Sequence, residues 1–276
     1  MKKEFENAVI AIIVFISILW LEKPLRSILL SYDIEFYKAK YSAGISVRFC
    51  LIILSLLLIR KLNFIKFTSL DNPKNLSNIQ SLIIPLVFIS IGLLGSWGNY
   101  VNAGALKLLL FTLSVLSIGI LEELFFRGII FPLCIKAFKN YKRAILIAAI
   151  LSSSCFGIIH FVNLFSQPDN LLGITSQVFF ALSIGVFFSG LLVRIGNILV
   201  PAIIHVLVNF SFGSSELKPL VDDITTISEN TGVNWNSLIP TTLFFAFIFA
   251  GGLFMILNCN KEELFTKLEI DGKPSN

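Results

Sequence analysis

Residues 104–135 read "GALKLLLFTLSVLSIGILEELFFRGIIFPLCI", an apolar run long enough to cross a bilayer, yet two glutamates and an arginine lie near its end. A membrane-spanning helix needs about 20 predominantly apolar residues. A charged side chain in the bilayer interior costs several kcal/mol, so such groups are rare, face the protein interior, and are paired or functional. This segment therefore predicts both a membrane fold and a buried polar site.

The composition of the whole chain also favours a membrane protein. Its 276 residues are 55% hydrophobic and only 14% charged, with a mean hydropathy of +0.85. A soluble domain is normally about one quarter charged. The basic residues flank apolar runs and form no arginine-rich stripe, so the net charge of +5 indicates membrane orientation and not nucleic-acid binding. The four cysteines are scattered singly, which is typical of small core residues.

Apolar runs separated by polar connections predict an all-α fold, a polytopic integral membrane helical bundle with about eight transmembrane helices. The first run lacks a small-residue cleavage site and is expected to remain as an uncleaved span. The fourth is too long for a simple span, and Pro132 near its end predicts a kink or a second, amphipathic piece. The expected spans are residues 7–22, 43–59, 79–97, 104–135, 144–165, 171–193, 195–212 and 238–258.

Basic residues in the connections predict the orientation of the bundle. With the N-terminus inside, most of them fall in the inner connections, including residues 60–74 and 136–143. The positive-inside rule therefore favours cytoplasmic N- and C-termini. The outer connection 22–42 is expected to lie partly on the membrane surface, and the outer segment 213–237 to be a solvated loop. No internal repeat or linker divides the chain, so residues 1–276 are expected to form a single membrane domain.

The three charges near the end of the fourth span divide into a pair and a single group. Residues four apart lie on one face of a helix, so Glu123 and Arg127 are expected to neutralise each other. Glu122 lies about 100° round the helix and is left free. A structural ion pair between helices, with Glu122 bonded to a polar neighbour, is an alternative explanation of these charges.

Both histidines of the chain also lie in apolar segments. His160 is in "CFGIIHFVN" and His205 is in "PAIIHVLVNF". Asn209 follows His205 by four residues, and Phe156 precedes His160 by four, so each pair shares one helix face. A lone buried histidine is usually a satisfied core residue, but two histidines, an asparagine and a spare glutamate favour a shared polar site.

Such a set of side chains is typical of peptide-bond hydrolysis. A glutamate in an apolar cavity activates water when a nearby histidine shares its proton. A second histidine and an asparagine amide supply donors for the oxyanion that forms when water attacks a carbonyl. Glu122, His160 and His205 are equally a two-histidine, one-carboxylate set of the kind that binds zinc, although the HExxH spacing is absent. The residues thus leave a metal-free and a zinc-dependent site open.

Three motifs together resemble the CPBP or Abi family, which comprises type II CAAX prenyl proteases and bacteriocin-processing enzymes. "EELFFR" fits EExxxR, "FGIIH" fits FxxxH and "HVLVN" fits HxxxN, in the family's order and on spans of the same kind. The resemblance covers residues 104–212. It implies that this region is a catalytic core, with three accessory spans before it and one after it.

The resemblance also implies a role for each motif residue. Glu122 would activate the water, with His160 assisting. His205 and Asn209 would stabilise the oxyanion. The supporting residues would be Glu123, Arg127 and Phe156.

These observations predict an intramembrane endopeptidase of the glutamic or metallo type, with no cofactor favoured and zinc as the alternative. A non-catalytic membrane scaffold or bacteriocin-immunity protein and a proton-coupled carrier are the competing functions. The expected partners are a membrane-associated peptide or protein substrate and the lipid bilayer, without nucleic acid. Abundant Ile, Asn, Lys and Phe are typical of an AT-rich genome and favour a bacterial cell membrane. The sequence leaves the substrate and the oligomeric state open.

Overall fold

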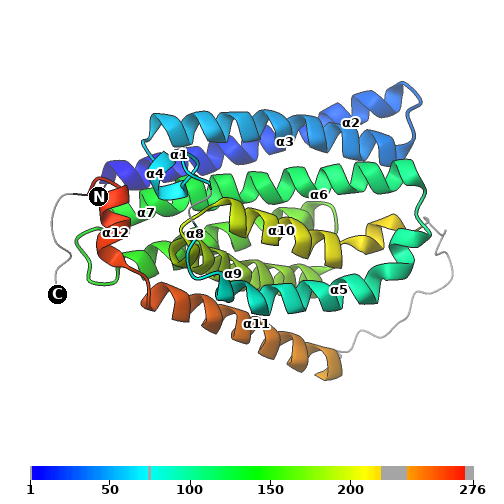
Figure 1. Ribbon diagram of the computed structural model, residues 1–276. Helices are drawn as coiled ribbons and strands as arrows, with labels where there is room; N and C mark the ends of the chain where they lie inside the picture. The colour runs from blue at the N-terminus through cyan, green and yellow to red at the C-terminus, as the bar shows by residue number, and fades with distance from the viewer. Residues whose placement is uncertain (1, 74–75, 219–234, 271–276) are drawn as a thin grey trace.

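The computed structural model describes residues 2–73, 76–218 and 235–270 (Figure 1). Within these ranges all regular elements are helices, and seven helices are long and apolar enough to cross a membrane. A further apolar helix, α10 (Leu199–Phe212), is shorter. The all-α, polytopic membrane bundle predicted from the sequence is therefore confirmed. Most of the loop expected over residues 213–237 lies outside the described residues.

Figure 1 shows the long helices lying roughly parallel in one bundle, with α12 at the same end as the start of α1. Four short turns of 3-10 or π type adjoin them: η1 (Ile79–Leu82), η2 (Phe126–Ile130), η3 (His160–Phe165) and η4 (Ser214–Leu217). The other helices are α1 (Lys2–Leu19), α2 (Glu22–Ser31), α3 (Phe36–Lys61), α4 (Ile65–Thr68), α5 (Ile83–Val101), α6 (Ala105–Phe125), α7 (Phe131–Ala137), α8 (Ala144–Ile159), α9 (Leu171–Ile195), α11 (Trp235–Leu257) and α12 (Lys261–Lys267).

The connection expected over residues 22–42 is mostly helical. It contains all of α2, and α3 begins at Phe36, earlier than the apolar run that predicted it. Arg48 on α3 donates hydrogen bonds to both carboxylate oxygens of Glu22, from Nε at 2.9 Å and from Nη2 at 3.0 Å. This bidentate pair holds α2 against α3. A search for apolar runs misses α2 because charged residues interrupt its apolar ones.

The fourth span is one long helical segment, but its irregularity precedes Pro132. α6 passes through the π turn η2 into α7, where Pro132 is the second residue. Proline has no N–H to donate to the preceding turn, which accounts for the interrupted α-helical hydrogen bonding at this point. The expectation of an amphipathic second piece is wrong, because every residue of α7 except Lys136 is buried. π turns occur frequently at functional sites, and this one carries Arg127.

α6 and α10 approach each other closely at Gly119. A Cβ atom at this position would lie 2.7 Å from Val206 Cγ2 and 3.0 Å from the Val206 backbone nitrogen. Small residues allow membrane helices to come this close. Val206 adjoins His205, and Gly119 lies one turn before Glu122 and Glu123. This contact therefore sets the separation between the charged end of α6 and the histidine of α10.

Replacing Gly119 by alanine is expected to force α6 and α10 apart. Overpacking of a tight contact costs about 1–3 kcal/mol, so the thermal unfolding midpoint in detergent should fall. Gly95→Ala is the matched control, because a Cβ atom at Gly95 would meet nothing within 4 Å. Equal midpoints for the two variants would contradict the close approach described for Gly119.

Candidate active site

A cavity of about 400 Å³ lies within the bundle between α3, α6, α9 and α10. On α6 it is lined by residues on one helix face, from Phe111 through Ser114 and Ile118 to Glu122. At a rise of 1.5 Å per residue these positions cover about 16 Å of helix. The cavity is therefore deep enough to hold several residues of an extended peptide.

The side chains expected to carry the chemistry all line this cavity. Glu122 comes from the last turn of α6, and His160 from the junction of α8 with η3. His205 and Asn209 come from successive turns of α10, and Phe156 lines the same wall as His160. The structure thus brings the three sequence motifs together, whereas the catalytic role of each residue stays a prediction.

Glu123 connects the buried arginine to one of the histidines. Arg127 Nη1 lies 3.0 Å from Glu123 Oε1, and both side chains are no more than 1% exposed. The same glutamate oxygen is 2.9 Å from His205 Nδ1. An ionised carboxylate only accepts hydrogen bonds, so Nδ1 carries a proton in this contact. Glu123 thereby orients the imidazole, as carboxylate partners of functional histidines commonly do.

Glu122 lies at the other ring nitrogen of this histidine. Its Oε2 atom is 3.4 Å from His205 Nε2, and its side chain is 15% exposed. With its proton on Nδ1, a neutral imidazole can only accept a hydrogen bond at Nε2, and an ionised Glu122 can also only accept one. A hydrogen bond between Nε2 and Glu122 therefore requires one more proton, which is carried by either the imidazole or Glu122. The family resemblance suggested His160 as the partner of Glu122. The direct contact in the structure is with His205, while His160 lines the same cavity.

Aromatic rings surround this chain of polar groups. The Arg127 guanidinium lies 4.8 Å from the centre of the Phe156 ring and 5.5 Å from that of Phe188. The Phe188 ring is 5.0 Å from the His205 ring. Phe156 packs edge-on against both histidine rings, at 5.3 Å from His160 and 6.0 Å from His205. Sequence analysis missed Phe188, because one phenylalanine in an apolar helix gives no separate signal.

The side-chain positions do not fit the zinc alternative. In the described part of the chain, no group of three histidine, cysteine, aspartate or glutamate side chains is arranged to hold a metal ion. Glu122 and His205 lie together, but His160 does not complete a ligand set with them.

The cavity reaches the end of the bundle remote from α12, where α3 begins (Figure 1), at a polar mouth formed by Lys40, Tyr41, Gly213 and Glu216. Glu216 accepts a hydrogen bond from Lys40 Nζ at 2.8 Å and another from the Tyr41 hydroxyl at 3.2 Å. The Lys40 and Glu216 side chains are 41% and 48% exposed, against 5% for His205. Exposure thus falls steeply from the polar mouth to the candidate active site.

The fold and this cavity define an integral membrane protein with carboxylate and imidazole groups gathered at a buried site. Residues 104–211 match the family described as "Rce1-like: Type II CAAX prenyl endopeptidase Rce1-like". The match agrees with the family that the three motifs resemble. It covers less than half of the chain. Searches of curated proteins and of solved structures gave no significant match.

The family match supports a function of the intramembrane CAAX protease kind, and together with the apolar helices it supports an integral membrane location. It also supports a peptide substrate within the membrane. The family match alone does not assign the chemistry to individual side chains, which must be argued from their geometry.

Proposed function

We propose that the protein is an intramembrane endopeptidase in which Glu122 activates a water molecule for attack on a peptide carbonyl. The observation that carries the proposal is the chain of contacts from Arg127 through Glu123 and His205 to Glu122, which ends at the cavity. A structural ion pair with Glu122 bonded to a polar neighbour accounts for the same contacts. It gives no reason for Glu122 and His205 to share a cavity with His160 and Asn209.

The charges of the four contacting residues favour a protonation state in which His205 is positively charged and Glu122 is ionised. Glu123 and Arg127 neutralise each other, so a proton on His205 balances an ionised Glu122. The imidazolium then donates Nδ1–H to Glu123 and directs Nε2–H toward Glu122 and the cavity. Pairing of all four charges reduces the cost of burying them. In this state Glu122 is free to accept a proton from water.

The remaining polar groups are suited to the later steps. As water attacks the carbonyl carbon, Glu122 takes its proton and the carbonyl oxygen becomes an oxyanion. His205 Nε2–H and the Asn209 amide, one turn apart on α10, donate hydrogen bonds to this oxyanion. Glu122 then gives the proton to the leaving nitrogen, and the C–N bond breaks to yield a carboxyl group and an amine. His160 helps to hold the attacking water.

The orientation of the protein is also proposed from its charges. Several basic residues lie at or just beyond helix ends on the side of α12: Arg60, Lys61, Lys136 and Lys142. The positive-inside rule places this side in the cytoplasm of a bacterial cell. The polar mouth then opens on the opposite face of the membrane.

Cleavage of a fluorogenic library of apolar peptides, including a farnesylated CAAX peptide, tests the function. The purified protein in liposomes is expected to cleave members of the library at equal rates with and without a chelator. Activity that a chelator removes and zinc restores would contradict the metal-free mechanism. A folded protein that cleaves no member of the library would contradict the assigned activity.

Asn209→Ala is expected to lower kcat by about 10²–10³-fold, the usual effect of losing one oxyanion donor. KM should change little, because this donor acts mainly on the oxyanion and not on the bound substrate. Steady-state measurements of kcat and KM on the library peptide that is cleaved fastest check this expectation. Asn102→Ala, at an exposed position after α5, is the control. A raised KM with unchanged kcat would instead indicate that Asn209 only binds substrate.

A further inference from the structure

We propose that the cleft between α5 and α11 is the route by which an apolar, membrane-embedded substrate segment reaches the catalytic cavity. The proposal rests on the endopeptidase function and adds the path and the class of substrate. The occupant is a helical apolar segment that moves sideways out of the lipid. α5 and α11 lie side by side at the edge of the bundle in Figure 1, and ring contacts described below join them.

The cleft is closed in this structure by three rings in contact, Phe88, Phe212 and Phe244, which we call the aromatic gate. Phe88 on α5 lies 4.4 Å from Phe212 on α10 and 4.6 Å from Phe244 on α11, measured between ring centres. The cleft itself has a volume of about 40 Å³. This is little more than the share of one water molecule in the liquid, roughly 30 Å³. A substrate segment therefore requires α5 and α11 to separate.

The cleft and the catalytic cavity share a wall one side chain thick. Ile184 on α9 and Val208 on α10 line both of them. Ile204 and Phe188 line the cleft as well; Ile204 directly precedes His205, and the Phe188 ring lies against the His205 ring. Phe212 of the aromatic gate also lines the cavity. Separation of the rings would thus connect lipid with the reacting groups.

The outer edge of the cleft matches an apolar occupant. Ile84 on α5 and Phe247 on α11 line it and are 52% and 58% exposed. All the residues that line the cleft are apolar or glycine. Lipid tails and apolar helices make similar contacts with such a surface, so a substrate segment can replace lipid there without losing a hydrogen bond.

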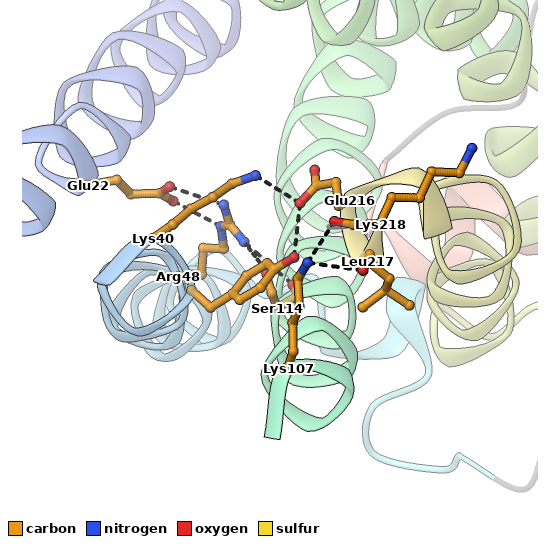
Figure 2. Close-up of polar contacts among 9 residues, drawn as sticks. Glu22, Lys40, Arg48, Lys107, Ser114, Glu216, Leu217 and Lys218 are labelled. Carbon is orange, nitrogen blue, oxygen red and sulfur yellow. Dashed lines mark hydrogen bonds and ion pairs between the residues drawn. The ribbon is translucent and has the colours of Figure 1, made fainter. Parts of the chain in front are cut away.

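The polar mouth is a poor route for such a segment. Lys40 and Glu216 form an ion pair across it, as Figure 2 shows. Deeper in the cavity, Arg48 pairs with Glu22 and donates a 2.8 Å hydrogen bond to the Ser114 hydroxyl. An apolar chain passing these groups would strip water from charges without replacing their hydrogen bonds, which is costly. Short polar peptides and water meet no such penalty.

α11 packs closely against α9 at Gly252, and we take this contact as the hinge of its movement. A Cβ atom at Gly252 would lie 2.6 Å from the backbone nitrogen of Phe187 on α9, so the two backbones touch there. Phe244 lies about two turns earlier in α11. In the proposed opening, the first half of α11 swings away from α5 about the Gly252 contact. This movement separates the Phe88 ring from the Phe244 ring.

Cross-linking the aromatic gate tests the route. In a Phe88→Cys/Phe244→Cys variant, a short bis-thiosulfonate reagent ties α5 to α11, and dithiothreitol releases them. Two substrates carry the same library sequence, one as a short soluble peptide and one fused to an apolar anchor of about 20 residues. Tyr100→Cys/Phe210→Cys is the matched control, because these stacked rings, 4.8 Å apart, tie α5 to α10 and leave α11 free. Wild-type protein treated in parallel accounts for the native cysteines.

Cross-linking of the gate is expected to slow cleavage of the anchored peptide on the order of tenfold or more, as expected for a gated step. The soluble peptide should be cleaved at the unlinked rate, and dithiothreitol should restore the loss. Unchanged cleavage of the anchored peptide after complete cross-linking would overturn the proposal. Equal loss of both substrates would also overturn it, because the link would then be acting on the site itself.

A second readout separates this proposal from the proposed function. With p-benzoylphenylalanine at Phe247 in the cleft, ultraviolet light is expected to capture the anchored peptide, whether or not the protein cleaves it. The same group at Leu57, which is 60% exposed on α3, is the control position. The proposed route would be overturned if the group at Phe247 captured only lipid. It would also be overturned if the groups at Phe247 and Leu57 captured the peptide equally. Failure of the reduced protein to cleave either substrate would count only against the endopeptidase function.

Discussion

Replacing Glu122 by glutamine is expected to lower kcat by about 10²–10⁴-fold, the usual contribution of a general base. Glutamine keeps the size of the side chain and the polar contact with His205, but it cannot accept a proton from water. The thermal unfolding midpoint should therefore stay close to that of the wild type. Initial rates on the best library peptide, measured with enzyme of verified fold, check the expectation.

Glu216→Gln is the matched control for this substitution. Glu216 is also a carboxylate lining the cavity, but it lies at the polar mouth and contacts Lys40 and Tyr41. Its replacement is expected to change the rate by no more than a few-fold. Similar losses in both variants would show that the cavity needs negative charge in general and would remove the specific role of Glu122. Full activity of Glu122→Gln would move the base to another residue.

Arg127→Met is expected to be among the most destabilising single substitutions in this protein. Arg127 is fully buried, and its loss leaves Glu122 and Glu123 to share the positive charge of His205, so one negative charge in the interior is unbalanced. Breaking a buried pair by removing one partner costs about 3–5 kcal/mol. Contacts of the guanidinium with Phe156 and Phe188 are lost at the same time. The thermal unfolding midpoint in detergent should fall sharply.

A second substitution distinguishes lost charge balance from lost packing. Glu123→Gln in the Arg127→Met background removes the unpaired charge, so the double variant is expected to be more stable than Arg127→Met alone. Its activity should remain low, because a neutral amide no longer fixes a positively charged His205. If the double variant is no more stable than the single one, the ion pair is not what stabilises this region.

The sequence predicted those features that depend on local spacing. Long apolar runs predicted the membrane-spanning helices. The four-residue spacing of Glu123 and Arg127 predicted that both side chains share one helix face, and in the structure Arg127 Nη1 lies 3.0 Å from Glu123 Oε1. Helical spacing also predicted that Asn209 shares a face with His205, and both line the cavity. These features follow from the geometry of a single helix, so they do not require knowledge of which helices pack together.

Features that depend on contacts between helices were not predictable in the same way. The contact of His205 with Glu122 and the packing of Phe188 on His205 arise from how α6, α9 and α10 meet. Gly119 permits one of these approaches, but a glycine in an apolar run does not reveal its neighbour. The π turn at Arg127 was not predicted either, because Pro132 indicates an irregularity nearby but not its type or its exact position.

Cleavage of the best library peptide in water enriched in ¹⁸O tests the central claim most directly. Mass spectrometry of the products from wild-type protein is expected to find one ¹⁸O atom in the new carboxyl group and a free amine on the other fragment. The Glu122→Gln protein, run beside it, should give neither fragment above background. Fragments without ¹⁸O at the new carboxyl group, or the same labelled fragments at the same rate from Glu122→Gln, would contradict hydrolysis by water that Glu122 activates.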